Sequence, residues 1–209
     1  MEVFQKKVYH LGMCTRFFIN RDEPAFAPIV KAVERSPLYE KFLLWAGKKI
    51  LTEGEIRPTD IVPVLASSRS GKPAAYPMRW GVHMADQTPL FNARAEANGV
   101  KPFFKEDWER RRCIVPASFY YEWNPQKEKF AIQPANSTVT WLCGLYRFED
   151  DLPYFVILTR DPSAELRQIH DRMPLILPEN KINEWIRPET DPSKLLPYAL
   201  TDMVYEHAE

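Results

Sequence analysis

The segment 113–159 alternates short apolar runs with turn-rich links, and this pattern constrains the fold more than any other feature of the chain. Aromatic and β-branched residues dominate the runs, as is typical of β-strands. Strands that follow one another at such short intervals usually pair in an antiparallel manner. We therefore expect an antiparallel meander built from residues 113–123, 129–133, 137–146 and 154–159.

The rest of the chain predicts further strands and several helices. Residues 13–19 indicate an early strand, and residues 60–66 and 74–82 flank a loop with the composition of a hairpin turn. Apolar residues recur at helical spacing over residues 24–50, with a break near Ser36 and Pro37, so two helices are expected there. Shorter helices are expected at residues 105–112, 161–168 and 179–187, and the three arginines at 110–112 are interpreted as a solvated run.

Length, composition and charge indicate one globular domain with no general affinity for polyanions. The chain has 209 residues, enough for one sizeable core, and it contains no Gly/Ser-rich linker. Its 19 prolines outnumber its 7 glycines, which favours many short elements joined by rigid turns. Its 28 basic residues equal its 28 acidic residues, so no global field would hold a nucleic acid non-specifically. A polyanion would therefore have to bind in a local cleft.

The cysteines and the hydropathy pattern bear on compartment and cofactors. Cys14, Cys113 and Cys143 are widely spaced and form no Cys-x-x-Cys pair, so neither a disulfide framework nor a zinc site is encoded. No run of about 18 uncharged apolar residues occurs, so no membrane span is expected. We therefore expect a soluble cytoplasmic protein without metal, cofactor or membrane partner, in which Cys113 and Cys143 are inert core residues.

Two strand-like segments place polar side chains where chemistry could occur. If residues 89–97 are extended, Asn92, Arg94 and Glu96 share one face and a row of small apolar residues lies opposite. In the segment 113–123, Glu122 lies among aromatic residues, where burial would raise its pKa toward the range useful for general acid–base catalysis. The alternative for Glu122 is a structural pairing with an arginine at the edge of the core.

A polar cluster lies between two apolar runs near the C-terminal end. Residues 169–174 contain His170, Asp171 and Arg172, and such a cluster at the edge of a core is a candidate catalytic site. His170 would follow the C-terminus of the helix expected at residues 161–168, where the helix dipole favours the imidazolium. The spacing is equally compatible with a surface pair of Asp171 and Arg172, with His170 bonded to a carbonyl.

Five sequence blocks, taken together, resemble a known family. They are Met13-Cys-Thr-Arg-Phe17, Trp80-Gly81, Pro89-Leu-Phe-Asn-Ala-Arg-Ala-Glu96, Pro116-Ala-Ser-Phe-Tyr-Tyr-Glu-Trp123 and Ile169-His-Asp-Arg-Met-Pro174. In this order they are similar to the signature blocks of the SRAP family, the SOS-response-associated peptidase domain. The resemblance covers nearly the whole chain from Met13 to about Tyr205, and the five blocks together are far more specific than any one of them.

The resemblance implies an α+β fold with a curved, barrel-like antiparallel β-sheet core surrounded by helices. It divides the chain into an N-terminal extension, residues 1–12, and a single domain, residues 13–209. It also implies a role in the response to DNA damage, because SRAP proteins bind single-stranded DNA and cross-link covalently to abasic sites. We expect a monomer whose partner is single-stranded DNA that contains abasic sites.

The resemblance also implies roles for individual residues. Cys14 would be the nucleophile, Glu122 would shuttle protons, His170 would assist opening of the sugar, and Asn92 would orient the terminal residue. Arginine suits phosphate because its planar fork makes bidentate contacts. The implied DNA contacts are Arg16, Trp80, Arg94 and Arg172.

The chain departs from the family pattern at two places. Family members carry the cysteine directly after the initiator Met, so that its free α-amine can form an imine with the abasic aldehyde, whereas Cys14 follows twelve residues and Met13. Either translation begins at Met13, or the protein cuts itself before Cys14, or this member does not cross-link. The second departure is Glu55, which stands in a segment where the family usually has an asparagine; a carboxylate facing DNA would repel phosphate.

Two other classes of function stay open. One is a thiol peptidase that acts only on its own leader, using Cys14 with His170 or Glu122. The other is a non-catalytic module that binds single-stranded DNA while the extension blocks Cys14. An abasic oligonucleotide separates the three classes, because only cross-linking shifts a denatured band and only the peptidase shortens the chain without a shift.

Overall fold

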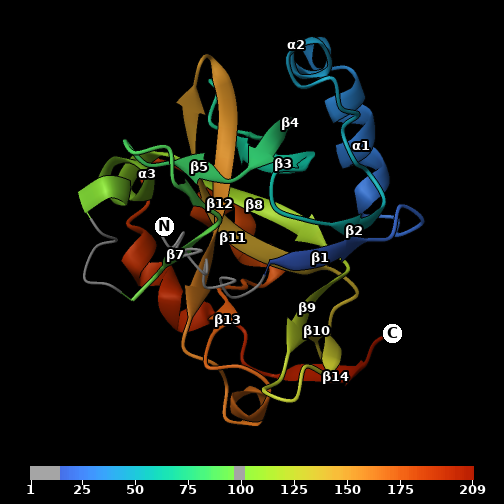
Figure 1. Ribbon diagram of the computed structural model, residues 1–209. Coiled ribbons are helices and arrows are strands. Elements are labelled where there is room, and N and C mark those ends of the chain that lie inside the picture. Colours follow the sequence, from blue (N-terminus) through green and yellow to red (C-terminus); the bar gives the residue numbers. More distant parts are fainter. Residues whose placement is uncertain (1–14, 97–101) are drawn as a thin grey trace, which may run out of the picture.

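Five strands close into a barrel that forms the core of the molecule. They are β3 (Ile61–Ser67), β4 (Pro73–Trp80), β8 (Arg112–Ala117), β11 (Thr140–Glu149) and β12 (Leu152–Arg160). The computed structural model describes residues 15–96 and 102–209. The strands pair in the order β11–β8–β3–β4–β12, and β12 pairs again with β11 to close the ring (Figure 1). The expected α+β fold with a barrel-like sheet is therefore confirmed.

One pairing within the barrel is parallel. Every neighbouring pair in the ring is antiparallel except β12 with β4. A parallel pair needs a long crossover connection, which residues 81–151 provide between these two strands. β12 also pairs in parallel with β7 (Asn92–Arg94) and antiparallel with β13 (Met173–Pro174). This strand therefore carries both segments that contain the polar clusters found in the sequence.

A second, five-stranded antiparallel sheet lies beside the barrel (Figure 1). Its order is β14 (Met203–His207), β10 (Lys129–Pro134), β9 (Phe119–Trp123), β1 (Arg16–Ile19) and β2 (Gly54–Ile56). A separate two-stranded ribbon is formed by β5 (Val82–His83) and β6 (Pro89–Leu90).

Ser118 turns the chain from the barrel into the second sheet. Its backbone N–H donates to the carbonyl of Phe18 at 2.8 Å, and its Oγ accepts from the backbone N–H of Asn20 at 2.9 Å. Its carbonyl accepts from Oγ1 of Thr140 at 2.9 Å. The prediction of one strand over residues 113–123 was therefore wrong, because β8 and β9 belong to different sheets. For the same reason the expected meander is realised only as two separate antiparallel pairs, β9 with β10 and β11 with β12, because β10 and β11 lie in different sheets.

Helices cover the barrel on two sides (Figure 1). α1 packs on β3 and β4, and α4 packs on β8. As expected, two helices break at Ser36, whose Oγ caps the second by accepting from the N–H of Leu38 at 3.3 Å. None of the helices within residues 15–96 and 102–209 is long and apolar enough to cross a membrane. The helices are α1 (Phe26–Glu34), α2 (Pro37–Ala46), α3 (Lys105–Arg110) and α4 (Ile182–Ile186), and the 3₁₀ helices are η1 (Pro102–Phe104), η2 (Glu165–Gln168), η3 (Glu179–Lys181) and η4 (Pro192–Tyr198).

The arginine run at residues 110–112 is not wholly solvated, because Arg112 is 1% exposed. Its guanidinium donates to backbone carbonyls of Trp108 at 2.6 Å, Trp185 at 2.7 Å and Thr190 at 2.8 Å. Burial lowers the pKa of Arg112 to about 10. This side chain therefore fastens α3 and the segment around α4 to the barrel, which corrects the interpretation of the run for this residue.

Candidate functional site

The first sheet strand begins two residues after the predicted nucleophile. Cys14 itself lies outside the described residues. Arg16, the first residue of β1, lies opposite Tyr121 of β9, the residue that precedes Glu122. The pairing of β1 with β9 therefore brings the segment that follows Cys14 next to the strand that carries the predicted proton shuttle.

Glu122 is buried, as the aromatic character of its strand indicated. The residue is 4% exposed and lies opposite Phe130 of β10. Its neighbours along the strand, Tyr121 and Trp123, alternate with it and point to the other face of the sheet. The carboxyl group thus occupies a site with little water, on the face that meets the barrel.

Glu55 lies among three cations rather than alone. Its carboxylate accepts from Arg16 at 2.7 Å, from Arg57 at 2.9 Å and from Lys129 at 3.3 Å. Burial alone would raise the pKa of Glu55, but the hydrogen bonds from Arg16, Lys129 and Arg57 hold it below its ordinary value. Three cations around one carboxylate leave a net positive group, so the repulsion of phosphate expected from Glu55 is offset locally.

His170 follows η2 in the turn before β13. Its Nδ1 lies 3.2 Å from the backbone N–H of Arg172 and 2.9 Å from Oδ1 of Asp171. Nδ1 can accept from the Arg172 N–H only when it carries no proton, whereas the Asp171 carboxylate can accept from Nδ1 only when the ring is protonated there. In the imidazolium Nδ1–H faces Asp171 and Nε2–H stays available. Both ring contacts with described residues use Nδ1, so Nε2 is the nitrogen that could donate a proton to a substrate.

The prediction of a polar row in the segment 89–97 is confirmed by the pattern of burial. Ala93 and Ala95 are 8% and 5% exposed and face the core, whereas Arg94 is exposed and Asn92 is half-buried. Asn92 lies opposite Ile157 and Arg94 opposite Thr159, both on β12. β12 therefore holds this row beside the turn that contains His170.

Arg172 ties these segments together. Its guanidinium makes a bidentate contact with Glu96 at 2.7 and 2.6 Å, and it also contacts Asp161 at 2.5 Å and the carbonyl of Thr159 at 2.9 Å. Burial alone would raise the pKa of Glu96, but the hydrogen bonds from Arg172 hold it below its ordinary value of 4.5. With 7% of the residue exposed, Arg172 is already bonded to carboxylates where the sequence led us to expect a phosphate.

Sequence reasoning missed the role of Asp161 and of Glu96 as partners of Arg172. A helix was expected over residues 161–168, but the Asp161 carboxylate bonds to Arg172 and, in this segment, the structure forms the 3₁₀ turn η2 instead. The signal available in the sequence was the presence of two acidic residues, Glu96 and Asp161, in segments flanking β12. These two residues come close to Arg172 only because β7 pairs with β12, and no local sequence pattern predicts that pairing.

Trp80 is a correction to the predicted DNA contacts. The residue is 0% exposed, and its ring packs against Phe17 at 5.2 Å and Phe155 at 6.1 Å. Its indole N–H donates to the carbonyl of Phe91 at 2.9 Å. A side chain enclosed in this way offers no face to a base, so Trp80 stabilises the barrel and its link to β7.

The two groups of candidate residues lie on elements that contact each other. Gln168, two residues before His170, donates from Nε2 to the hydroxyl of Tyr205 at 2.7 Å. The ring of Tyr205 on β14 lies 5.8 Å from that of Phe130, the residue opposite Glu122. The His170 turn of the barrel therefore meets the second sheet, although the route from Glu122 to His170 passes through three intervening side chains, those of Phe130, Tyr205 and Gln168.

Cys113 and Cys143 lie in the core of the described structure. Cys113 and Cys143 are fully buried, and burial raises the pKa of both thiols well above the ordinary value, which fits inert core residues. Among the residues that the structure describes, no group of three or more His, Cys, Asp or Glu side chains is arranged to hold a metal ion.

Comparison with known proteins identifies the family that shares this sequence and fold. The family model described as SOS response associated peptidase (SRAP) matches residues 13–208. The abasic site processing protein YobE of Bacillus subtilis is 34% identical over 74% of this chain and 82% of its own length. The abasic site processing protein YedK of Escherichia coli is 29% identical over 85% of this chain and 81% of its own length. A crystal structure of a Bacteroides thetaiotaomicron protein superposes with a TM-score of 0.70 at 19% identity, over 94% of this chain and 92% of that one. The chain therefore belongs to the SOS response associated peptidase (SRAP) family.

Proposed function

We propose that this protein binds single-stranded DNA at abasic sites and forms a covalent cross-link through Cys14. The observation that carries the proposal is the buried carboxyl of Glu122 on β9, beside the strand that begins two residues after Cys14. Relatives that cover most of this chain are named abasic site processing proteins, which supports the same reaction class. Residues 1–12 are then an extension that precedes the reactive domain.

The chemistry requires a free amine on Cys14. The ring-opened abasic sugar presents an aldehyde; the α-amine adds to its carbon to give a carbinolamine, which loses water to form an imine. The thiol then adds to the imine carbon, its proton passes to the nitrogen, and a five-membered thiazolidine closes. The balance is one aldehyde plus one aminothiol giving one thiazolidine and one water, with no oxidant or reductant.

The described residues suit the proton transfers in this sequence. Glu122, in a site with little water, would accept and return protons during carbinolamine formation and dehydration. His170 would donate from Nε2 to the ring oxygen as the sugar opens, and Asn92 would orient the terminal residue. Arg94, exposed at the end of β7, would contact a phosphate. We assign Arg172 instead to positioning, because Glu96 and Asp161 occupy its guanidinium.

The test compares two forms of the chain, one that starts at Cys14 and one that starts at Met1. Each is incubated with a single-stranded oligonucleotide carrying one abasic site and with the intact oligonucleotide, and the products are separated on a denaturing gel. We expect the form that starts at Cys14 to give a covalent product with the abasic strand only. Its intact mass should equal the sum of protein and DNA less one water.

The controls separate the other classes of function. Cys14→Ala in the same form should abolish the product while leaving the unfolding midpoint unchanged. If the longer form shortens itself to begin at Cys14, N-terminal sequencing will show the new terminus, and the product should then follow. The absence of a covalent product from the form that starts at Cys14 would sink the proposal, whether or not the DNA binds non-covalently.

A further inference from the structure

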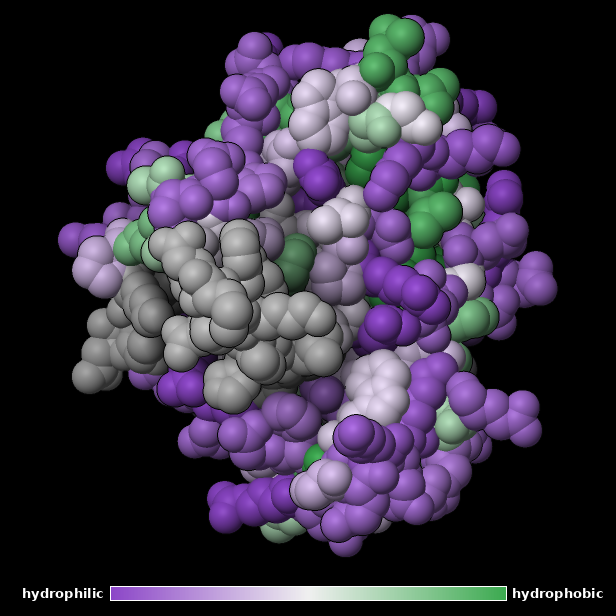
Figure 2. All heavy atoms as spheres, viewed as in Figure 1, coloured by the Kyte–Doolittle hydropathy of each residue, from purple (hydrophilic) through white to green (hydrophobic). Residues whose placement is uncertain are grey.

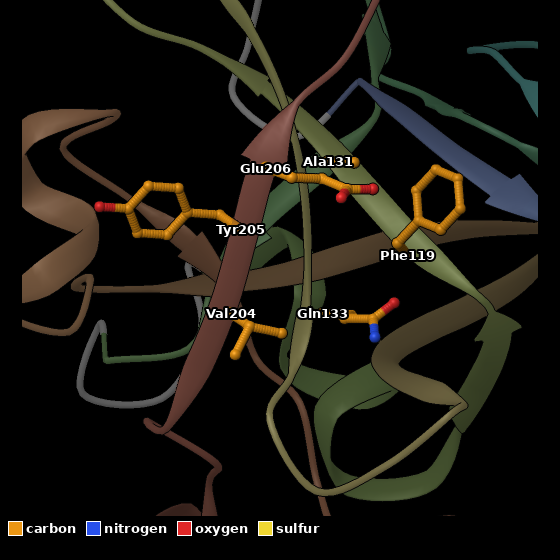
Figure 3. A pocket seen from close by; sticks show the side chains of 6 residues that line it. All are labelled: Phe119, Ala131, Gln133, Val204, Tyr205 and Glu206. Atoms are coloured by element: carbon orange, nitrogen blue, oxygen red, sulfur yellow. The ribbon is translucent and has the colours of Figure 1, made fainter.

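Tyr205 of β14 points from the second sheet toward the barrel. It lies opposite Ile132 of β10, which in turn lies opposite Tyr120 of β9, and residues paired directly across a sheet share a face. Ile132 and Tyr120 are 1% and 0% exposed, so this is the face that packs on the barrel. Figure 3 shows the Tyr205 ring on the opposite side from Phe119, the neighbour of Tyr120. Glu122, two residues after Tyr120, lies on the same face as Tyr205.

The Tyr205 side chain contacts a residue near each of the two predicted proton-transfer groups. Its ring centre lies 5.8 Å from that of Phe130, the residue opposite Glu122, with one ring edge toward the other ring. Its hydroxyl accepts from Nε2 of Gln168 at 2.7 Å, and Gln168 lies two residues before His170. One side chain therefore connects the strand that carries the predicted proton shuttle with the turn that carries the imidazole.

The turn that carries His170 is otherwise anchored to the barrel. Before it, Ile169 is 3% exposed and belongs to the hydrophobic core. After it, β13 pairs with β12. These anchors fix the turn on the barrel, whereas Glu122 belongs to the second sheet. The bond between Gln168 and Tyr205 links the turn to that sheet as well.

This bond lies at a hydrophilic surface. Gln168 is exposed, and Tyr205 is 39% exposed. Figure 2 shows mainly hydrophilic side chains at the bottom of the view, where Figure 1 places β14. Water competes for hydrogen-bonding groups at such a surface, so one bond there contributes little to the stability of the fold. Its loss should therefore shift the turn without unfolding the protein.

We propose that Tyr205 is a positioning residue for the reacting centre. Its ring packs beside the partner of Glu122 and its hydroxyl holds Gln168, so it keeps His170 at a fixed place relative to Glu122. The inference rests on the proposed function, in which these two groups transfer protons at the same abasic sugar.

Loss of the bond should affect the step assigned to His170 rather than the steps assigned to Glu122. β9 pairs on both sides, with β1 and with β10, so it keeps its place without Tyr205. The step assigned to His170 is opening of the closed sugar. The bond between C1′ and the ring oxygen breaks, the ring oxygen takes the proton from Nε2, and the C1′ hydroxyl returns a proton through water as it becomes the aldehyde. A substrate that is already open does not need this step.

The main test therefore compares two single-stranded oligonucleotides, using the form of the chain that gives the covalent product. One carries an abasic sugar, and the other carries an acyclic aldehyde at the same place. Tyr205→Phe keeps the ring and removes the hydroxyl. We expect it to slow adduct formation with the abasic strand by roughly two- to tenfold, the effect of one hydrogen bond. The rate with the acyclic aldehyde should stay at the parental value.

Variants of the partner residue test the same bond from the other side. Gln168→Leu should reproduce the loss, and the double variant with Tyr205→Phe should be no slower than either single variant, because both changes remove one bond. Gln168→Glu should restore a nearly parental rate, since its carboxylate can accept from the Tyr205 hydroxyl. These variants also decide the question if Tyr205→Phe fails to fold.

Two controls set the scale. His170→Gln should slow the reaction of the abasic strand more than Tyr205→Phe does, and should likewise leave the acyclic aldehyde unaffected. Tyr39→Phe removes a hydroxyl from α2, which lies at the opposite end of the view from β14 (Figure 1), and both rates should stay parental.

Equal slowing with both oligonucleotides would overturn the proposal, because it would indicate a general loss of structure or of DNA binding. A parental rate with the abasic strand in Tyr205→Phe and Gln168→Leu would overturn it as well, also where His170→Gln is parental. Failure of the proposed function overturns both proposals and is distinguishable, because the parent itself then forms no covalent product with the abasic strand.

Discussion

Glu122 has almost no contact with water, and this burial decides what a substitution there will do. Glutamine has the same size but cannot carry a proton, so Glu122→Gln should slow adduct formation by roughly 10²–10⁴-fold, the usual contribution of general acid–base catalysis. The rate is read from the time course of the covalent band on a denaturing gel, using the form that starts at Cys14. Glu128→Gln, in the exposed turn before β10, is the matched control. A parental rate in Glu122→Gln would assign the proton transfers to another group.

Arg172 is expected to matter for stability as well as for the position of His170. Removal of its guanidinium breaks buried hydrogen bonds to charged partners, so Arg172→Ala should lower the free energy of unfolding by about 1–3 kcal/mol. Urea unfolding measures this change. Arg167→Ala, at an exposed position of η2, should change it by less than about 0.5 kcal/mol.

The pH dependence of that difference identifies the partner of Arg172. The pKa of Glu96 is depressed in the folded protein, so its stabilisation is complete above the ordinary value of 4.5 and is lost as the pH falls through the lower, folded pKa. The gap between parent and Arg172→Ala should therefore be constant near neutral pH and shrink below about 4.5. A gap that persists unchanged into acid would show that the carboxylate contacts contribute little.

Single residues also show what the sequence could and could not reveal. Alternation correctly placed Arg94 and Glu96 on one face and Glu122 in an apolar strand. The contact of Glu96 with Arg172 spans 76 positions of the sequence and follows from the parallel pairing of β7 with β12, which no local pattern indicates. The prediction that Trp80 contacts DNA was wrong for a related reason. A tryptophan next to a glycine has the same local sequence whether its side chain is buried or exposed.

At the scale of elements, the barrel depends on a close approach of β11 and β12 at Gly144. A Cβ added there would lie 2.7 Å from the carbonyl oxygen of Val156 and 2.9 Å from Sγ of Cys113. The first neighbour is backbone and the second ends a short side chain that is 0% exposed, so the backbone must shift. Gly144→Ala should therefore cost about 1–3 kcal/mol of stability, as overpacking in a core usually does.

Thermal unfolding tests this prediction against a glycine in an open turn. Gly71 has a φ of +75° and nothing within 4 Å of an added Cβ, and asparagine tolerates such a backbone better than other residues. Gly71→Asn should therefore leave the unfolding midpoint nearly unchanged. Equal losses in the two variants would mean that Gly144 is not required for the contact between β11 and β12.

Elements with strong local signals were predicted well, and those set by distant contacts were not. Ser36 and Pro37 begin α2 as expected, because capping and the fixed φ of proline act within a few residues. The break at Ser118 was missed, because the bonds that turn the chain there come from Asn20, Phe18 and Thr140. The local sequence of such a run is the same whether its residues form one strand of one sheet or two strands of different sheets.

At the scale of the whole molecule, the net charge is zero, so DNA binding must depend on local groups of cations. The 28 basic and 28 acidic residues cancel, so affinity must come from a few clustered cations. Arg16, Arg57 and Lys129 around Glu55, and Arg94 on β7, are the cationic side chains that the site offers to phosphates. If each neutralises one phosphate of a single strand, log affinity should fall against log salt with a slope of about −2.8, that is about −0.7 for each contact.

The corresponding measurement is anisotropy with an intact 20-nucleotide strand between 50 and 200 mM salt, where this slope predicts roughly a fifty-fold loss of affinity. An intact strand keeps the measurement free of covalent product, so it reports electrostatics alone. A slope near zero would contradict phosphate binding by these side chains, because each phosphate contact contributes to the slope. A slope steeper than about −5 would instead require cations beyond these four, on a surface other than β1, β2, β7 and β10.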